Sequence, residues 1–320
     1  MYPSFIFIVT PKVFIHVGHG KTGTSALQTY LANASQKIAE NGFIYPSCSN
    51  IEEARLGRVT SGNITLPSNG RWFQKSILPS LRQALPTSHT YIYSNETVFF
   101  SMNSLFDAID KGQIKPESLE ILLAIRNPQE MISSAYQQAV KHGGIGLSFD
   151  EFLRSQNYIC HHTATAAKLI KKLTTLNVKF KLFNYSRLGY SLVEDVASHI
   201  GIANYYSADE FKNKTVNRSL SYAELHSVLL INQLYPGTKG RQLAKELVNE
   251  VPCTKTFRPA ISSESLSIFS DKMQPFLDAI NCILSPQDCL VLSDSCAEKS
   301  DYSMRLSDQQ AKIIRFYLSS

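Results

Sequence analysis

The sequence predicts an α/β fold of three layers, in which helices cover both faces of a central, mostly parallel β-sheet and a helical C-terminal part follows. Short apolar runs rich in β-branched and aromatic residues alternate with segments of helical periodicity as far as Gly201. A glycine-rich loop joins the first of these runs to the first helical segment. Strand patterns fade beyond about residue 220, where the remaining periodicity is helical.

The first element is a buried strand over Val13–Val17, which ends at a glycine. The loop Gly18–Gly23 follows and reads GHGKTG. From Thr24 the apolar residues recur at helical spacing on one face. We expect Thr24 or Ser25 to cap the start of this helix and Gly42 to end it.

The same alternation continues along the chain. Strands are predicted over 91–94, 121–125 and 178–183, and helices over 128–141, 164–176 and 192–200. Further helices are predicted over 222–234, 241–251, 265–280 and 307–318. Strands that alternate with helices imply a parallel sheet. Since no linker-like stretch interrupts the chain, we expect one domain over 1–320, with an α/β core over 12–220 and a helical part over 221–320.

The composition narrows the class of protein. Hydrophobic residues make up 43% of the 320 residues and charged residues 18%, which excludes a disordered polar chain. The formal charge of +6 suits an anionic ligand, but no dense lysine and arginine run predicts nucleic-acid binding. No apolar run approaches the roughly 20 residues of a membrane span, and we find no secretion signal. We therefore expect a cytoplasmic protein without stable membrane insertion.

The cysteines do not predict a metal centre. Cys282, Cys289 and Cys296 recur every seven residues, unlike the close pairs of zinc sites. Cys160-His161-His162 is adjacent in sequence, so its side chains point in different directions, and a polar loop is favoured there. We expect reduced thiols and no bound metal.

The loop after the first strand has the features of an anion site. A strand that turns through glycines into a helix presents free backbone N–H groups and the positive end of the helix dipole. Gly18 and Gly23 have the separation of the Walker motif, yet Thr24 stands where that motif requires lysine. The lysine is instead Lys21, inside the loop.

Gly18, Gly20 and Gly23 also match the spacing of dinucleotide-binding loops, which is a weak signal by itself. Lys21 and its neighbouring hydroxyls suit a compact phosphoryl or sulfuryl group better than a pyrophosphate bridge. The residues predicted to bind this group are Gly20, Lys21, Thr22, Gly23, Thr24 and Ser25.

Residues 16–28, HVGHGKTGTSALQ, resemble the 5′-phosphosulfate-binding loop of sulfotransferases that use 3′-phosphoadenosine 5′-phosphosulfate (PAPS). The Lys-Thr-Gly-Thr form with a following Leu-Gln is similar to bacterial members and to the carbohydrate-modifying branch. Residues 41–46, NGFIYP, are similar to bacterial members too. The resemblance implies a P-loop-like fold, PAPS as the donor, a metal-independent reaction, and a sugar hydroxyl of a polysaccharide or glycolipid as the acceptor.

A second motif follows the strand over 121–125. In the family, an arginine at the strand end and a serine eight positions later hold the 3′-phosphate of the donor, and Arg126 and Ser134 have this spacing. Arginine offers phosphate a planar fork of donors. Ser134 lies almost two turns into the next helix and can face back toward Arg126, whereas the Ser133 side chain should point elsewhere.

A third stretch, NRSLS over 217–221, also resembles bacterial members. Arg218 is a candidate contact for the 3′-phosphate side of the donor. An equally open alternative is a capping box, in which Ser221 caps a helix that carries Glu224 at its third position.

The chemistry requires a group that stabilises the leaving oxygen and a base. Lys21 is the candidate for the leaving side, and the resemblance implies the same role. Glu96 is the first candidate for the base because it follows the strand over 91–94 and its Ser-Asn-Glu segment partly matches carbohydrate-acting relatives. The alternative for Glu96 is a carboxylate at the start of a helix that begins at Thr97.

Histidines are the rival bases. His19 lies in the loop itself, and His16 lies inside the strand, where a buried, hydrogen-bonded state is expected. His142 is a weaker candidate for the acceptor groove. Two other functions stay open: a P-loop kinase or phosphotransferase, which requires magnesium and a Walker lysine, and a silent anion-binding module on the same fold.

Overall fold

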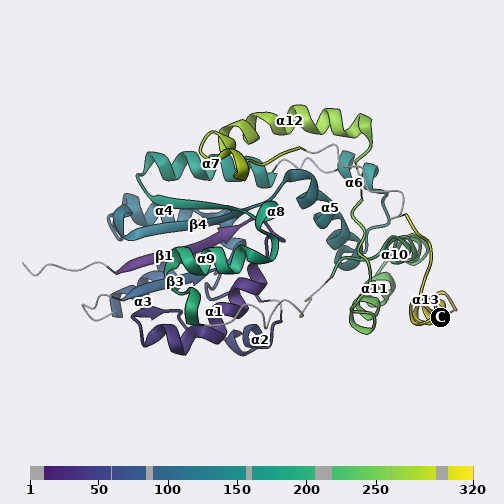
Figure 1. Ribbon diagram of the computed structural model, residues 1–320, viewed down its shortest axis with the longest axis horizontal. Helices are drawn as coiled ribbons and strands as arrows, with labels where there is room; N and C mark the ends of the chain where they lie inside the picture. Colours follow the sequence, from purple (N-terminus) through teal and green to yellow (C-terminus); the bar gives the residue numbers. More distant parts are fainter. Residues whose placement is uncertain are drawn as a thin grey trace, which may run out of the picture. The chain divides into compact units, whose positions relative to one another are not determined.

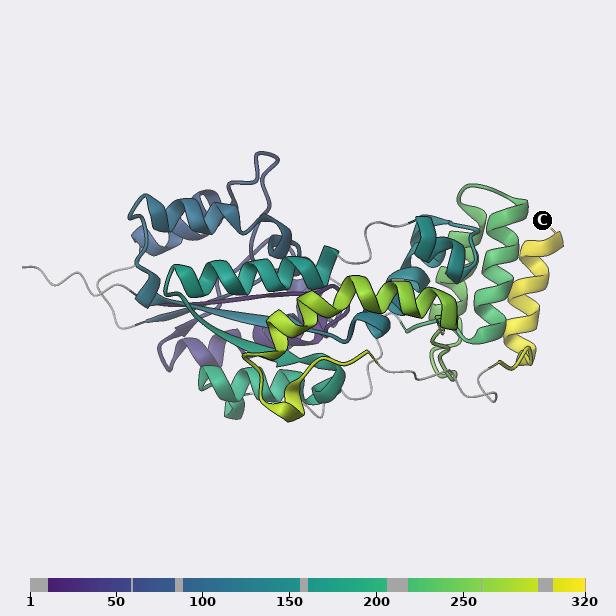
Figure 2. The same cartoon turned by 90° about the horizontal axis from the view of Figure 1, so that it is seen from above.

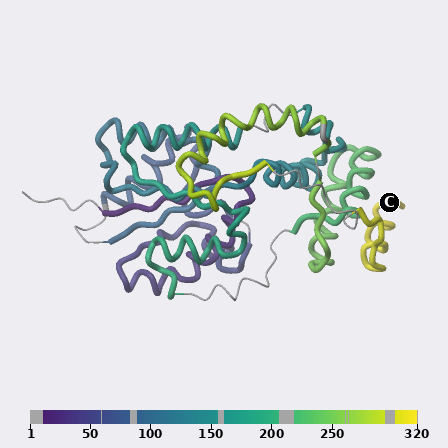
Figure 3. The backbone as a smooth tube through the Cα atoms, turned by 45° about the horizontal axis from the view of Figure 1, so that its top comes forward, coloured from purple at the N-terminus to yellow at the C-terminus, as the bar shows by residue number. Residues whose placement is uncertain are grey.

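The computed structural model describes residues 11–58, 60–83, 89–155, 161–205, 218–259, 261–292 and 302–319. Contacts within the chain divide it into two compact units, each built from separate stretches. The first comprises Met1–Arg126, Thr165–Lys214 and Ile280–Cys289, and the second comprises Asn127–Ala164, Thr215–Ala279 and Leu290–Ser320. Figure 3 traces the backbone and draws the remaining residues in grey.

The first unit contains a parallel five-stranded sheet, which confirms the predicted α/β class with a parallel central sheet. The strand order is β2-β3-β1-β4-β5. The strands are β1 (Lys12–Gly18), β2 (Phe43–Ile44), β3 (Thr90–Ser94), β4 (Leu119–Ile125) and β5 (Lys179–Asn184). All four predicted strands are present, and β2 is the one that sequence periodicity missed because it has only two residues.

Helices cover both faces of this sheet (Figure 1). On one face α1 (Thr24–Ala39) and α9 (Leu192–Ile200) form a core with the strands, in which Leu27 and Val196 contact apolar residues of the sheet. On the other face lies α7 (His161–Thr175), whose residues from Thr165 onward belong to this unit. The other helical elements of this unit are short: α2 (Ile51–Arg55), η1 (Phe73–Ile77), α3 (Leu78–Gln83), η2 (Glu96–Ser101), α4 (Asn103–Asp110), η3 (Pro116–Ser118), α8 (Tyr185–Leu188), η6 (Gly189–Ser191), η7 (Ala203–Tyr205) and η9 (Pro286–Asp288).

The start of α1 differs from the prediction. Gly23 is the N-cap residue, with a left-handed φ of 73°, and no side chain caps the helix there. Thr24 is the first residue of the helix, one position after the N-cap, and its hydroxyl donates to Glu96. The helix ends at Ala39 with Glu40 as its C-cap, two residues before the predicted end at Gly42, whose φ of 81° favours glycine.

A loop is bonded to the carboxyl end of β3. The backbone N–H of Asn63 donates to the Ser94 carbonyl at 3.0 Å, and the Ser94 N–H donates to Oδ1 of Asn63 at 2.8 Å. Gly62 has a φ of 82°, and a Cβ there would lie 1.8 Å from the Ser94 carbonyl oxygen. Only glycine permits this approach, so the loop fixes the strand end that precedes Glu96.

The carboxyl end of β5 is held by a segment distant in sequence. The Asn184 amide donates to the carbonyls of Asp288 and Cys289 at 3.0 and 3.3 Å. Arg187, in α8, forms an ion pair with Asp288 at 2.5 Å. Residues 280–289 therefore support the point at which the chain leaves the sheet toward α8.

The second unit is helical. Its elements are α5 (Pro128–Gln138), η4 (Ala139–Gly143), α6 (Phe149–Ser155), α10 (Tyr222–Leu234), α11 (Lys239–Glu250), α12 (Ser263–Asn281), most of which belongs here, and α13 (Asp308–Ser319). Figure 2 shows α10, α11 and α13 side by side. They share a core in which Leu225, Leu247 and Ile313 are buried. The helical patterns after residue 220 are confirmed within two residues. Contacts within the chain also group α5 and α6 with these helices.

In the described ranges, no helix has both the length and the apolar character required to cross a bilayer.

Candidate anion-binding and catalytic site

The site lies at one edge of the sheet in the first unit. Because all five strands are parallel, their carboxyl ends meet at the same edge, where open α/β sheets carry their ligands. The register places His16 beside Ser94 and Gly18 beside Ala124. The segments that follow β1, β3 and β4 are therefore spatial neighbours, although about 100 residues separate the first from the last.

Internal hydrogen bonds shape the glycine-rich loop. The His19 N–H donates to the Ala124 carbonyl at 2.9 Å, and the buried Thr22 hydroxyl donates to the His19 carbonyl at 2.7 Å. A Cβ on Gly18 would lie 2.4 Å from the Ala124 oxygen, which requires glycine there. The Thr22 hydroxyl thus stabilises the loop from within, while the loop leads to the positive N-terminus of α1.

Lys21 occupies a left-handed conformation with a φ of 67°, which is rare for a residue with a side chain. Burial lowers the pKa of the Lys21 ammonium, the nearby Glu96 carboxylate raises it, and Arg126 lowers it further. The net direction is downward. The ammonium of Lys21 therefore interacts electrostatically with one negative and one positive group, which the sequence could not show.

Arg126 is 8% exposed and contacts the loop directly. Its Nη1 donates to the Lys21 carbonyl at 3.1 Å. The guanidinium also lies over the ring of Tyr185, 5.3 Å from its centroid, in a cation–π contact. These contacts fix the side chain of Arg126 beside the glycine-rich loop.

Glu96 is brought to the loop from the end of β3. The Thr24 hydroxyl donates to Oε2 of Glu96 at 2.5 Å. Glu96 is also the first residue of η2, whose start is capped by Asn95 through a 2.7 Å bond from the Thr97 N–H. The alternative of a carboxylate at the start of a helix agrees with this geometry, and the role of Glu96 as the base stays a prediction.

The two histidines near the loop are buried. The Arg126 N–H donates to Nδ1 of His19 at 3.2 Å, and the His19 ring packs edge-on against Phe99. Nδ1 of His16 forms a 3.0 Å hydrogen bond with the Ser94 hydroxyl, and burial lowers the pKa of His16 to about 4. The buried, hydrogen-bonded state predicted for His16 agrees with this geometry, and its ring is neutral near pH 7.

Tyr185 is a site residue that sequence reasoning missed. It follows the carboxyl end of β5, and a Cβ on Gly23 would lie 2.9 Å from its ring. The ring therefore touches both the start of α1 and Arg126. Its position two residues after the predicted strand over 178–183 was the available signal, because residues at that edge of a parallel sheet line the ligand site.

Ser134 lies in α5, in the second unit, and is half-buried. The hydroxyl of the neighbouring Ser133 donates to the Pro259 carbonyl at 2.8 Å. The pairing of Ser134 with Arg126 stays a prediction.

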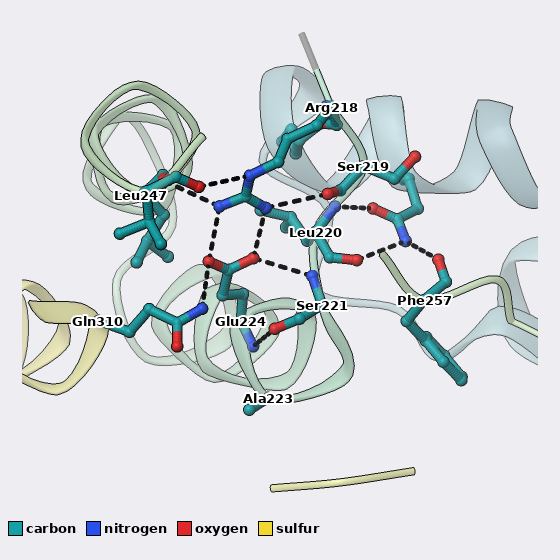
Figure 4. Close-up of polar contacts among 12 residues, drawn as sticks. Arg218, Ser219, Leu220, Ser221, Ala223, Glu224, Leu247, Phe257 and Gln310 are labelled. Atoms are coloured by element: carbon teal, nitrogen blue, oxygen red, sulfur yellow. Dashed lines mark hydrogen bonds and ion pairs between the residues drawn. The ribbon is translucent and has the colours of Figure 1, made fainter. Parts of the chain in front are cut away.

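Arg218 forms a buried polar cluster in the second unit (Figure 4). All five of its N–H donors have protein acceptors, namely the carbonyls of Ser219, Leu247 and Val251 and both carboxylate oxygens of Glu224. The bonds to Glu224 measure 2.7 and 2.8 Å. Since a guanidinium has five donors, none remains for a phosphate in this arrangement.

The capping box predicted as the alternative is present at the start of α10. The Ser221 hydroxyl accepts from the Glu224 N–H, and Glu224 accepts from the Ser221 N–H. Burial alone would raise the pKa of Glu224, but hydrogen bonds from Arg218, Ser221 and Gln310 outweigh it and lower the pKa. The structure favours a structural role for Arg218; Asn217, in the same motif, lies outside the described residues.

In the portion of the chain that the structure describes, no group of three or more histidine, cysteine, aspartate or glutamate side chains is arranged to hold a metal ion. Cys160 and Cys296 lie outside that portion.

No protein-family model matches the chain, and no curated protein matches it significantly. Among solved structures, the chain is similar to a sulfotransferase from Alicyclobacillus acidocaldarius, with a TM-score of 0.43 and 15% sequence identity. The match covers 85% of this chain and 95% of the other.

Proposed function

We propose that this protein is a sulfotransferase that moves a sulfuryl group from PAPS to a hydroxyl group of an acceptor. The proposal rests on one observation: Lys21, Arg126 and Glu96 lie near one another at one edge of the sheet, beside the N-terminus of α1. Two cations and a helix N-terminus attract an anionic donor, and one carboxylate can take a proton. The sequence likeness of residues 16–28 and 126–136 to the family supports PAPS in particular.

In this proposal the glycine-rich loop and the first turn of α1 hold the 5′-phosphosulfate, with N–H groups and hydroxyls as donors. Arg126 and Ser134 are proposed to hold the 3′-phosphate. Arg218 is left out of the donor site because its five donors are already bonded within the protein.

The transfer is in line. An acceptor oxygen attacks the sulfur, the bond from sulfur to the bridging phosphate oxygen breaks, and the electron pair stays on that oxygen. Lys21 stabilises the charge that develops there. Glu96 accepts the proton of the attacking hydroxyl. We propose a sugar hydroxyl of a polysaccharide or glycolipid as the acceptor, by analogy with the relatives that the loop resembles.

The experiment is calorimetric binding of the product nucleotide, 3′-phosphoadenosine 5′-phosphate, without magnesium and beside ATP and AMP. We expect micromolar binding that requires the 3′-phosphate. Arg126→Ala should weaken it by about 1.5–3 kcal/mol, the value of a lost charge-assisted hydrogen bond. The control is Arg58→Ala, which removes an exposed arginine paired with Glu53 and should leave the affinity unchanged.

Absence of nucleotide binding, or ATP binding that requires magnesium, would contradict this function. The second result would favour the kinase alternative.

A further inference from the structure

The hydroxyl of Thr24 connects the proposed donor loop to the proposed base. It is buried, with 5% of the residue exposed, and it donates to Oε2 of Glu96 at 2.5 Å. A hydroxyl has one proton and can donate one hydrogen bond at a time. Thr24 is also the first residue of α1, where an anion meets the helix N-terminus.

We propose that Thr24 is a positioning residue that couples donor binding to the release of Glu96. Its hydroxyl donates to the Glu96 carboxylate in the donor-free protein and to the donor anion when the donor is bound. The inference rests on the proposed function, since it assigns an order of events within that same site.

The exchange requires only a rotation of the Thr24 side chain, because the backbone around Glu96 is held in place. Asn95 anchors the backbone before Glu96, because its amide donates to the Ile64 carbonyl at 2.7 Å and its oxygen accepts from the Thr97 N–H. The carboxylate is thus attached to a fixed segment. Rotation about the side-chain bonds of Thr24 redirects the hydroxyl without any movement of the backbone.

The charges set the direction of the exchange. The Lys21 ammonium interacts with Glu96, and Arg126 contacts the Lys21 backbone. An incoming anion draws the ammonium and the hydroxyl to itself. The carboxylate then loses a hydrogen bond that stabilises its charged form, which makes it a stronger base. Glu96 is therefore ready for an acceptor only after the donor has bound.

A double-mutant cycle tests the exchange through binding of 3′-phosphoadenosine 5′-phosphate, measured by calorimetry. Glu96→Ala removes a negative charge and also the acceptor that competes for the Thr24 hydroxyl, so the nucleotide should bind more tightly. In the Thr24→Val background only the charge effect remains. We expect Glu96→Ala to strengthen binding about tenfold more in the parent than in that background, as a competing charge-assisted hydrogen bond implies.

Two further variants separate this role from a merely structural one. Thr24→Ser retains the hydroxyl and should retain the coupling to Glu96. Ser25→Ala is the matched control, because it removes a hydroxyl from the same turn of α1 and leaves the Thr24–Glu96 bond in place; its cycle with Glu96→Ala should show no coupling. Thermal unfolding of each variant verifies the fold, and Thr24→Ala replaces Thr24→Val if the latter does not fold.

Equal strengthening by Glu96→Ala with and without the Thr24 hydroxyl would overturn the exchange and leave the proposed function intact. A parent protein that does not bind the nucleotide would overturn both.

Discussion

Single backbone positions determine the shape of the anion loop. Gly23 combines a left-handed φ of 73° with a tyrosine ring that a Cβ would approach to 2.9 Å. Gly20 differs, because a Cβ there would meet no heavy atom within 4 Å. These two glycines of one loop therefore give a matched pair for testing which of them the loop requires.

We predict that Gly23→Ala destabilises the protein by about 1–2 kcal/mol, from the left-handed backbone alone, and weakens nucleotide binding as Tyr185 is displaced. Gly20→Ala should leave the stability nearly unchanged. Chemical denaturation and calorimetry measure the two effects. A Gly23→Ala protein as stable as the Gly20→Ala protein would contradict the steric argument.

Substitutions of Lys21 and Glu96 test two different catalytic roles. Lys21→Ala should abolish turnover, because the leaving oxygen loses its cation. Glu96→Gln should remove turnover without weakening nucleotide binding, because the amide cannot accept the acceptor's proton. The measurement is release of 3′-phosphoadenosine 5′-phosphate from PAPS with polysaccharide acceptors. Full activity of Glu96→Gln would transfer the role of base to His19.

At the scale of elements, one buried ion pair joins three helices of the second unit. Arg218 and Glu224 are both almost fully buried, and Glu224 also accepts from Gln310 in α13 at 2.8 Å. Arg218 in turn donates to the Leu247 carbonyl in α11. The start of α10, one turn of α11 and the start of α13 therefore depend on the same two charges.

We predict that Glu224→Gln costs about 3–5 kcal/mol, since it leaves a buried guanidinium without its counter-charge. The matched control is Glu53→Gln, which breaks the exposed pair with Arg58 and should cost at most about 1 kcal/mol. Urea unfolding followed by circular dichroism reports both. Equal midpoints for the two variants would show that the buried pair contributes no more than the exposed one.

Sequence patterns over a few neighbouring residues predicted the helices and strands well, but they did not predict contacts between residues distant in sequence. The strand before the loop, the helices over 222–234 and 192–200, and the capping box at Ser221 all depend on residues close in sequence, and all are present. The bond from Thr24 to Glu96 spans 72 residues, and only the strand order makes them neighbours. The contact of Tyr185 with Gly23 likewise joins residues that are distant in sequence. Arg218 also uses all its donors only because carbonyls of α11 and of the C-terminal end of α11 accept from it.

For the whole molecule, the buried His16 predicts a pH dependence of stability. Its pKa falls from 6.5 to about 4 on folding because burial disfavours the charged ring. Between these values the unfolded chain binds a proton that the folded protein does not, so the free energy of unfolding decreases as the pH falls from 6.5 to 4. The loss from this group is on the order of 3 kcal/mol.

Urea unfolding between pH 7 and pH 4 measures this dependence. His16→Gln keeps a polar side chain beside Ser94 but does not titrate, so its stability should fall less over the same range. Parallel pH profiles of the parent and His16→Gln proteins would contradict the role of His16.

The support of β5 by residues 280–289 also has a consequence for synthesis on the ribosome. Asn184 and Arg187 are translated about a hundred residues before Asp288, to which both are bonded. During translation the carboxyl end of β5, beside Tyr185, therefore has no contact with residues 280–289 until α10, α11 and α12 have been made. A nascent chain stalled before residue 280 has all five strands but lacks these bonds, so the carboxyl end of β5 is accessible to chaperones and proteases for that interval.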